Sequence, residues 1–356
     1  MKVKLLGVVM PVSRKLKRPA SPAASTLPPE VVRAFHRDLA AWYACVRRDL
    51  PWRRTADPYA ITVSEFMLQQ TQVATVIPYY ERWLRAFPDW RALAAAAPEK
   101  VIKQWEGLGY YQRARNLQKL AQAVAALPGA RLPETVEGLR ALPGIGPYTA
   151  GAVASLALGK RAALLDGNVI RVFARVFGIE EEVGRRDVQL RMWAIAEALL
   201  PEAARCADHN SSLMELGALV CAPQNPSCLL CPLRKVCRVP GSRLPNKAPR
   251  AVERREEEIA VIAQKGKWWC EQAPEKGRLG GFWRFPHWDA ATMARGKQLA
   301  SFLYSITKYR VTLTAWEASF QKGAALPPGR WCSRAEMEAL SMPSAHRRLR
   351  DLLPDA

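Results

Sequence analysis

Four cysteines fall within one 17-residue stretch of this 356-residue chain, with the spacing Cys221-x6-Cys228-x2-Cys231-x5-Cys237. Four thiolates so close in sequence can converge on one metal centre without a long loop closure, so the stretch indicates a ligand set. A structural zinc site usually has two separated Cys-x2-Cys pairs, and only Cys228 and Cys231 have that spacing here. The uneven spacing therefore favours an iron–sulfur cluster, with zinc as the alternative.

The remaining cysteines indicate the redox compartment of the chain, and the net charge indicates the kind of partner that it binds. The other four cysteines are scattered, which does not fit a disulfide framework and indicates a reducing compartment: Cys45, Cys206, Cys270 and Cys332. The formal net charge of +21 predicts a polyanionic partner bound with an affinity that falls steeply with salt. Ribosomal or membrane-surface binding would give the same charge. No apolar run approaches the roughly 18 residues needed to span a bilayer.

A glycine-rich turn supplies a candidate anion site. The segment 142–150, LPGIGPYTA, joins helices expected at 133–141 and 148–158. Gly144 and Gly146 allow a tight turn with the intervening isoleucine in the core, and free N–H groups of the next helix then face outward. Such groups bind a DNA phosphate without reading sequence, although an ordinary helix–helix turn would have the same composition.

Two carboxylates could divide acid and anion chemistry between them. Glu65 precedes the apolar residues 66–68 near the start of an expected helix, and burial there would keep it protonated as a general acid. Asp166 precedes a helix with an apolar face and is expected to be its N-cap, where backbone N–H groups favour the anion. One acid and one anion are the pair that suits oxocarbenium-like chemistry. A surface glutamate and a purely structural cap are the alternatives.

A helical domain and a second, mixed domain must position these groups. From Pro29 to about Leu200 apolar residues recur at helical spacing, prolines and glycines punctuate them, and strand alternation is absent. Helices are expected at 72–87, 99–104 and 116–127. After a proline-rich basic segment, RVPGSRLPNKAPR, strands are expected at 258–263 and 310–319.

At this length two domains are expected, each large enough for its own core. The apolar piece at 5–12 is too short for a signal peptide, and its surroundings carry six basic side chains: Lys2, Lys4, Arg14, Lys15, Lys17 and Arg18. We therefore expect a disordered basic tail at 1–29, an all-α domain at 30–237 closed by the cysteine loop 221–237, a linker at 238–250 and a smaller α+β domain at 251–356.

Taken together, these motifs resemble those of the helix-hairpin-helix DNA glycosylases, through the hairpin, the aspartate in 164–171 (LLDGNVIR) and the cysteine cluster. Within that group the chain is similar to the MutY-type adenine glycosylases in 51–53 (PWR), 63–73 (VSEFMLQQTQV), 107–116 (GLGYYQRARN), 214–221 (MELGALVC) and 279–286 (LGGFWRFP). The resemblance covers about residues 30–290. It implies a mainly α protein: a helix-hairpin-helix DNA glycosylase fold with a 4Fe-4S cluster loop, plus a smaller α+β Nudix-like C-terminal domain.

The activity that the resemblance implies is monofunctional hydrolysis of the N-glycosidic bond of adenine mispaired with 8-oxoguanine or guanine in duplex DNA, which starts base excision repair. Glu65 would protonate N7 of the flipped adenine, and Asp166 would stabilise, or transiently bond to, the positive sugar. Asn168 would help to orient the site. Tyr148 occupies the hairpin position of the Schiff-base lysine of endonuclease III-like relatives, and a phenol cannot form that imine. We expect Tyr148 to hydrogen-bond near Asp166.

The resemblance also implies how DNA and a cofactor are held. Trp52 and Arg53 match residues that line the adenine pocket. Gln70 and Tyr110 match residues that insert into the duplex when a base is flipped, although Tyr110 could also be a packed aromatic beside a glycine-rich turn. The turn glycines, Gly144 and Gly146, would bind a phosphate. The four cysteines would hold a 4Fe-4S cluster that keeps a basic loop against the DNA backbone.

The chain departs from the family pattern at two places. Thr307 and Lys308, after an isoleucine, stand where the family usually has the Phe-Ser-His loop that recognises 8-oxoguanine, and neither reproduces the histidine. Ser211 stands where a glutamine or glutamate often contacts adenine, so a weaker or water-mediated contact is expected. The C-terminal residues also lack the acid-rich metal-binding helix of a nucleotide-hydrolysing Nudix domain, so this domain is expected to bind and not to hydrolyse.

Other functional classes fit some of these features. An endonuclease III-like glycosylase and lyase for oxidised pyrimidines is the alternative enzyme, and Tyr148 and the QQTQ run oppose it. A catalytically inactive DNA-binding module is opposed by the presence of both carboxylates, and a redox-sensing iron–sulfur regulator is a further class. We expect a monomer with no membrane partner that binds double-stranded DNA containing an A:8-oxoG or A:G mismatch. Its expected location is the bacterial cytoplasm, associated with the nucleoid through DNA.

Overall fold

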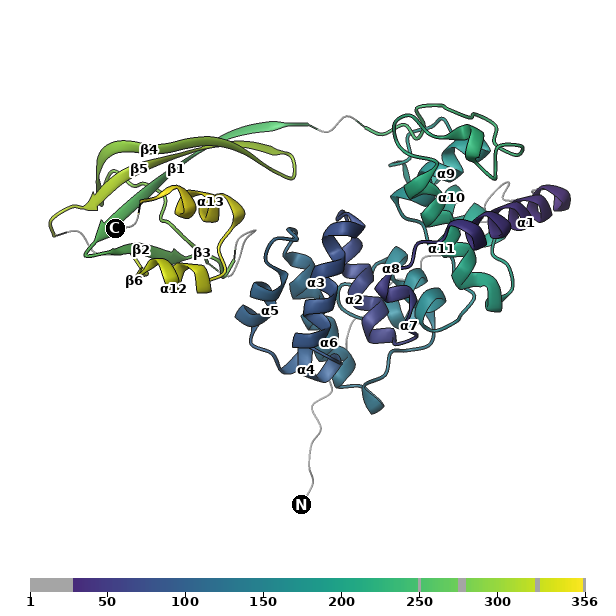
Figure 1. Cartoon of the computed structure of the whole chain (residues 1–356), viewed down its shortest axis with the longest axis horizontal. Helices are drawn as coiled ribbons and strands as arrows, with labels where there is room; N and C mark the ends of the chain where they lie inside the picture. The colour runs from purple at the N-terminus through teal and green to yellow at the C-terminus, as the bar shows by residue number, and fades with distance from the viewer. Residues whose placement is uncertain (1–27, 249–250, 275–279, 324–326, 355–356) are drawn as a thin grey trace, which may run out of the picture.

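The computed structural model describes residues 28–248, 251–274, 280–323 and 327–354, which form a helical domain and a smaller mixed domain (Figure 1). The tail expected at 1–29 falls outside these residues except for its last two, and the first helix begins at Pro29. The helices of the first domain are α1 (Pro29–Val46), α2 (Pro58–Leu68), α3 (Val73–Ala86), α4 (Trp90–Ala95), α5 (Pro98–Trp105), α6 (Gln112–Ala125), α7 (Val136–Arg140), α8 (Pro147–Ala152), α9 (Gly167–Phe177), α10 (Arg186–Ala198) and α11 (Ala203–Leu219).

Local sequence signals fix many of these helix boundaries. Asp57, Asp89, Thr135 and Asp166 cap α2, α4, α7 and α9 by accepting backbone N–H groups of the first turn. Proline is the first residue of α1, α2, α5 and α8, where its missing N–H costs nothing. The helices expected at 72–87, 99–104 and 116–127 are confirmed as α3, α5 and α6. The helix expected at 148–158 is α8 followed by one π-helical turn, Val153–Ala157.

Two apolar cores divide the helical domain into two lobes. The core of the first lobe is built from α2 to α6 and includes Trp83, Trp105 and Leu117, all fully buried. The core of the second lobe joins α1 to α9, α10 and α11 around Phe35 and Phe173. The chain therefore starts in the second lobe, builds the first, and returns through α8, whose residues pack against both cores. The two groups of helices lie side by side in Figure 1.

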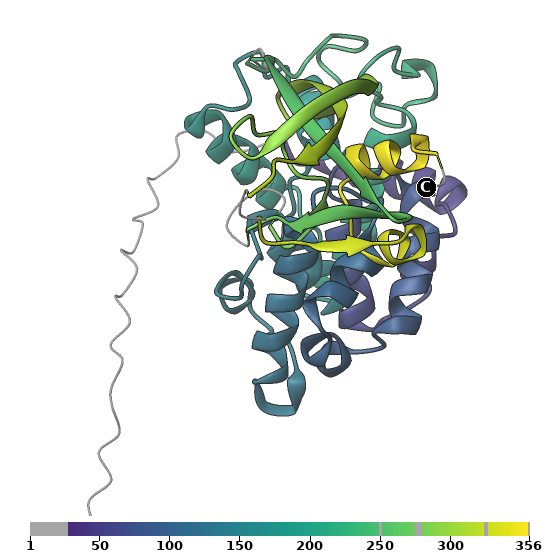
Figure 2. The same cartoon turned by 90° about the vertical axis from the view of Figure 1, so that its left-hand side faces the viewer.

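The C-terminal domain is a sheet with helices against one face. Its strands have the order β3-β2-β1-β5-β4, with β6 paired to β2, and β1 runs parallel to β5. In the view of Figure 2 the sheet lies in front of the helical domain. The strands expected at 258–263 and 310–319 are confirmed within β1 and β5. The elements are β1 (Glu253–Gln264), β2 (Lys267–Gln272), β3 (Trp283–Arg284), β4 (Met293–Ile306), β5 (Tyr309–Phe320), β6 (Arg330–Cys332), α12 (Arg334–Ala339) and α13 (Ser344–Leu352).

Side chains of β1 alternate between the two faces of this sheet, as a strand requires. Ile259 and Val261 pack in the core that contains residues of α12 and α13, whereas Ala260 and Ile262 pack with tryptophans on the opposite face. Among the described residues no helix has both the length and the apolar character needed to cross a bilayer.

The segment with linker composition, 238–250, is packed over much of its length. The N–H of Val239 donates to the carbonyl of Arg175 at 3.2 Å, and Asn246 accepts from the N–H of Val183 at 3.0 Å. Leu244 is buried in the core of the second lobe. The structure thus places most of the expected linker against the second lobe. The sequence did not predict this packing, because composition alone does not reveal contacts with a distant helix.

One phenylalanine of the C-terminal domain docks into the helical domain. Phe282, just before β3, is fully buried in the core of the first lobe. Its ring meets that of Tyr111 edge-on, with 4.4 Å between ring centroids, and the guanidinium of Arg115 lies 5.9 Å from its centroid. Arg115 also donates to the carbonyl of Gly280.

Polar contacts around Glu106 form a second part of this interface. Its carboxylate accepts the N–H of Met342 at 3.0 Å and Nζ of Lys103 at 2.8 Å. Lys103 also donates to the carbonyls of Glu338, at 2.6 Å, and Leu340, at 3.2 Å. Both parts of the interface therefore lie beside residues 106–111, which connect α5 to α6.

We predict that Phe282→Ala weakens the docking of the two domains by about 3 kcal/mol, because it leaves a cavity in the core of the first lobe. Urea unfolding should become less cooperative, and limited proteolysis between the domains should accelerate. Phe282→Leu should retain most of the docking. Leu303→Ala, at a position on β4 that is 70% exposed, is the control. Equal rates of proteolysis for Phe282→Ala and Leu303→Ala would show that Phe282 does not hold the two domains together.

Candidate active site

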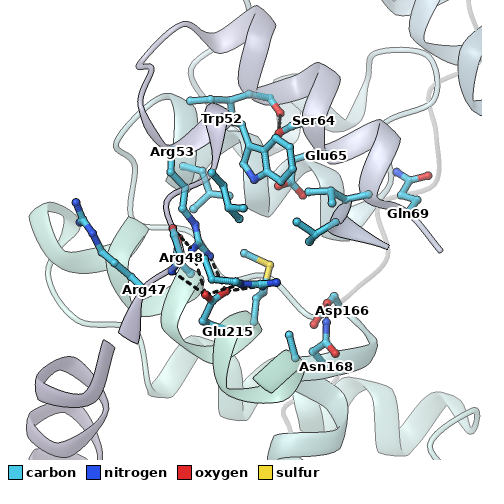
Figure 3. Close-up of a pocket in the computed structure, with 18 of the residues that line it drawn as sticks. Arg47, Arg48, Trp52, Arg53, Ser64, Glu65, Gln69, Asp166, Asn168 and Glu215 are labelled. Atoms are coloured by element: carbon cyan, nitrogen blue, oxygen red, sulfur yellow. Dashed lines mark hydrogen bonds and ion pairs between the residues drawn. The ribbon is translucent and has the colours of Figure 1, made fainter. Parts of the chain in front are cut away.

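A cavity of about 1140 Å³ lies between the lobes and is lined by α2, α8, α11 and the start of α9. It brings together residues that are far apart in the chain, and Figure 3 shows the labelled ones around it. Eight of the residues singled out from the sequence line it: Trp52, Arg53, Glu65, Gln70, Tyr148, Asp166, Asn168 and Ser211. Five others are not among its lining residues: Tyr110, Gly144, Gly146, Thr307 and Lys308.

Glu65 lies in this cavity as a buried carboxyl group. It belongs to the C-terminal half of α2, not to its start as expected, and its side chain is only 3% exposed. Burial raises the pKa of Glu65 to about 7, with a further increase from Asp166 and opposing effects of the Tyr148 hydrogen bond and Arg53. Burial therefore favours the protonated form of Glu65 relative to an exposed glutamate.

Tyr148, which was expected to hydrogen-bond near Asp166, has Glu65 as its hydrogen-bond partner in the cavity that Asp166 also lines. Its hydroxyl donates to Oε2 of Glu65 at 2.5 Å and lies 3.7 Å from the sulfur of Met214 on α11. Burial, together with the charges of Glu65 and Asp166, raises the pKa of Tyr148 well above its usual value. The tyrosine is therefore a neutral hydrogen-bond donor that connects α2 to α11.

Asp166 is the N-cap of α9, as expected. Its carboxylate accepts the N–H of Val169 at 2.7 Å and the side-chain amide of Asn168 at 2.9 Å. Burial raises the pKa of Asp166, while these hydrogen bonds and Arg171 oppose the increase. Asn168 is itself fixed, because its Oδ1 accepts from Arg171 at 2.9 Å.

Close packing of α11 on the start of α9 requires a glycine. A Cβ added at Gly217 would lie 2.5 Å from Cβ of Asn168 and 3.0 Å from its Cα. The carbonyl of Gly217 also accepts from Arg171 at 2.7 Å. The glycine in the MELGALVC segment thus sets the position of Asn168, and through it that of the Asp166 carboxylate.

Two arginines and a buried glutamate form one wall of the cavity, and the sequence analysis missed this arrangement. Oε1 and Oε2 of Glu215, on α11, accept from Arg48 at 2.8 Å each, and Oε2 accepts from Arg53 at 2.9 Å. Glu215 is 1% exposed. A usable signal was present, since a carboxylate within the apolar run of MELGALVC predicts burial and therefore a cationic partner.

Gln70 and Tyr110 lie on the two connections that leave α2 and α5, and both have positive φ, 59° and 48°. One buried guanidinium ties the connections together. Arg113 donates to the carbonyls of Phe66 and Met67 in the last turn of α2 and of Gln69 just after it. It also donates to the carbonyls of Leu108 and Gly109, before Tyr110. Tyr110 is 48% exposed, so it is not the packed aromatic that was considered as an alternative.

The glycine-rich turn has the expected form. Ile145 is buried in the core of the first lobe at 7% exposure. Gly144 has φ of +76°, and an added Cβ would lie 2.7 Å from Cβ of Asn116, so both conformation and space require glycine. Gly146 precedes α8 as its N-cap, with open space around it.

Thr307 and Lys308 lie on the C-terminal domain, in the turn between β4 and β5. Both are exposed, and Thr307 has φ of 53°. Lys308 pairs with Glu253 of β1. The structure therefore keeps these two residues apart from the cavity, on a separate surface.

The four cysteines of the 221–237 loop line one small cavity beside α9 and α11. Nη1 of Arg175, on α9, donates to Sγ of Cys221 at 3.3 Å, and Sγ of Cys237 donates to the Arg175 carbonyl at 3.3 Å. Burial raises the pKa of Cys231 to about 11 and also raises that of Cys237. Within the described ranges no three His, Cys, Asp or Glu side chains form a group that would hold a metal ion.

Comparison with known proteins agrees with this architecture. Residues 63–198 match the HhH-GPD superfamily base excision DNA repair protein, and residues 258–352 match the NUDIX domain. The adenine DNA glycosylase of Rattus norvegicus is 34% identical over 416 residues, covering 94% of this chain and 80% of that protein. The adenine DNA glycosylase of Homo sapiens is 47% identical over 216 residues, and the alignment covers 58% of this chain and 39% of the human protein.

Solved structures share the fold of the helical domain. A thermostable thymine-DNA glycosylase is 32% identical with a TM-score of 0.54, covering 59% of this chain and 96% of that one. A trapped endonuclease III–DNA covalent intermediate is 23% identical with a TM-score of 0.51. The match covers 60% of this chain and 97% of the endonuclease III chain. The helix-hairpin-helix fold and the Nudix-like domain are confirmed. The chain therefore belongs to the adenine DNA glycosylase family, whose members are base excision repair glycosylases of the helix-hairpin-helix superfamily.

Proposed function

We propose that this protein hydrolyses the N-glycosidic bond of adenine mispaired with 8-oxoguanine or guanine in duplex DNA, without cutting the strand. The observation that supports this most directly is the buried Glu65, which is hydrogen-bonded to Tyr148 and lines one cavity together with Asp166. An adenine released from its sugar needs a proton, and the sugar that remains needs a negative charge nearby. Glu65 and Asp166 provide these two groups.

The proposed steps balance as a hydrolysis. Protonated Glu65 gives its proton to N7 of the flipped adenine, and the glycosidic bond breaks with its electron pair on the base. Asp166, as an anion held by Val169 and Asn168, stabilises the oxocarbenium-like sugar. Water then adds to the sugar carbon and gives its proton to the Glu65 carboxylate, which restores the acid. Trp52 and Arg53 line the space for the base.

Tyr148 supports a reaction that uses water. Its phenol cannot form a Schiff base, and its raised pKa keeps it as a donor to Glu65. One observation favours the alternative of a lyase, since exposed Lys247 is also among the lining residues of the cavity. This lysine is the residue through which a covalent intermediate could form, so the test below includes its replacement.

DNA contacts are proposed on three surfaces. Gln70 and Tyr110 would enter the duplex beside the flipped base. Both are exposed, and Arg113 binds the carbonyl of the residue before each of them. Gly144 and Gly146, at the start of α8, present backbone N–H groups to a phosphate. Thr307 and Lys308 form an exposed turn for the base opposite adenine.

We also propose that the four cysteines hold a 4Fe-4S cluster. The four cysteines surround one cavity, where as thiolates they would repel one another unless a cationic centre lay between them. Arg175 supplies a hydrogen bond and a positive charge beside Cys221. The uneven spacing of the four cysteines in the sequence favours a cluster over a single ion. When bound, it would cross-link the loop internally, while Arg175 connects the loop to α9, and the catalytic steps would remain with Glu65 and Asp166.

Glu65→Gln is expected to reduce adenine excision by at least about 100-fold, because the amide cannot donate the proton, while binding of the duplex is retained. In the wild type the single-turnover rate should fall as pH rises through about 7, because the protonated carboxyl is the active form. Loss of binding by Glu65→Gln, or a rate that is constant between about pH 6 and 8, would contradict the role of a general acid.

We expect adenine to be released fastest from A:8-oxoG, more slowly from A:G and slowest from A:C duplexes in single-turnover assays. Strand breaks should appear only after added base, and borohydride should trap no covalent complex. Equal rates on the three duplexes would remove the mismatch-specific part of the proposal. Trapping that is lost in Lys247→Ala would instead support the lyase alternative.

Purified protein is expected to contain about four iron and four sulfide per chain and no stoichiometric zinc. Cys228→Ser should lower the iron content and the thermal stability together. Cys45→Ser, at an exposed cysteine outside the loop, is the control. Stoichiometric zinc without sulfide would show the alternative, a structural zinc site.

A further inference from the structure

Glu215 is the centre of a compact ionic cluster on the cavity wall. Arg48 donates to it three times, through Nε and Nη2 at 2.8 Å each and through its backbone N–H at 3.0 Å. Arg53 donates through Nη2 at 2.9 Å and Nη1 at 3.3 Å, and Nη1 also reaches the carbonyl of Arg48 at 3.0 Å. Figure 3 shows both arginines converging on Glu215, with Trp52 and Glu65 above them.

The carboxylate in this cluster is fixed as an anion. Burial by itself would raise the pKa of Glu215, but hydrogen bonds from Arg48 and Arg53 lower it to about 2. At neutral pH the cluster therefore combines two positive charges with one negative charge. An ion held by several charge-assisted hydrogen bonds can maintain its partners in one geometry.

Arg53 connects this cluster electrostatically to the proposed acid. The charged and titratable groups that act on Glu65 are Tyr148, Asp166 and Arg53, and Arg53 lowers the pKa of Glu65. Arg53 also lies over the ring of Tyr43, 5.6 Å from its centroid, which restricts its movement. The positive charge that Glu65 experiences thus depends on how far the Glu215 carboxylate neutralises Arg53.

We propose that Glu215 is a positioning residue that holds Arg48 and Arg53 against the cavity wall and, by neutralising part of their charge, keeps Glu65 in its protonated form. Arg48 and Arg53 have N–H groups left for the acceptor atoms of an incoming purine, because Glu215 takes up only part of their donor capacity. This role rests on the proposed function of Glu65 as the proton donor. Glu215 itself does not touch the reacting atoms.

Removing the negative charge of Glu215 and removing the positive charge of Arg48 should shift the pKa of Glu65 in opposite directions. Glu215→Gln leaves two guanidiniums without an anion, which favours ionised Glu65 and lowers its pKa. Arg48→Gln leaves Glu215 with one arginine, which makes the surroundings more negative and raises the pKa of Glu65. A purely structural role for the cluster would not produce shifts of opposite sign.

The test is the pH dependence of single-turnover adenine excision from an A:8-oxoG duplex between about pH 5.5 and 9. For Glu215→Gln we expect the midpoint of the basic limb to fall by about one pH unit, which lowers the rate at pH 7.5 by about eightfold. Arg48→Gln should move the midpoint upward. Glu215→Asp, which retains the charge, should keep the wild-type midpoint. Glu202→Gln removes one exposed carboxylate at the start of α11 and is the matched control.

A second measurement separates this inference from the proposed function. The ionisation of Glu65 can be followed without DNA by carbon-13 NMR of labelled glutamate carboxyls, assigned by comparison with Glu65→Gln. If the wild type releases no adenine, the proposed function fails, while opposite shifts of the Glu65 titration would still support the role of Glu215. Unchanged titration in both Glu215→Gln and Arg48→Gln would overturn it. If Glu215→Gln does not fold, Arg48→Gln and Glu215→Asp still decide the outcome.

Discussion

The burial of one ionisable carboxyl group is the constraint on which the rest of the structure depends. Removing Glu65 from water raises its pKa to about 7, and its hydroxyl partner comes from a different helix. A buried carboxyl group without partners would be strongly destabilising, so α2, α8 and α11 must meet around it. The two-lobed arrangement, with α8 packed against both cores, satisfies this requirement. It also leaves a cavity beside the carboxyl group that is large enough for a base.

A single helix, α9, connects the two chemically distinct regions of the helical domain. Asp166 caps its start, and Arg171 on its second turn binds both Asn168 and the carbonyl of Cys221, at 2.9 and 2.6 Å. Arg175, one turn further, contacts Cys221 itself. The cysteine loop therefore lies at one end of a hydrogen-bonded series that ends at the Asp166 carboxylate. This arrangement explains how the cysteine loop, although remote from the cavity, helps to fix the position of the Asp166 carboxylate.

Features that depend on neighbouring residues could be predicted from the sequence, and those that depend on distant contacts could not. The Asp166 cap and the turn around Ile145 follow from local rules, and burial of Glu65 follows from its apolar neighbours. The sequence placed the Tyr148 hydrogen bond near Asp166 but did not identify Glu65 as its partner, because the two residues are 83 positions apart. Glu215 was missed for a similar reason, since its arginines lie more than 160 residues earlier. The packing of 238–246 depends on the second lobe and has no local signature.

The connection between α5 and α6 shows how the two domains can act on one exposed side chain. Tyr110 has a positive φ, a conformation that costs on the order of 1 kcal/mol for a non-glycine residue and persists only if its surroundings hold it. Arg113 binds the carbonyls just before it, and Tyr111, just after it, packs against Phe282 of the C-terminal domain. On the other side, Glu106 accepts the N–H of Met342. Because contacts from the C-terminal domain bracket this connection, a shift of that domain on DNA would be transmitted to Tyr110 through packed side chains.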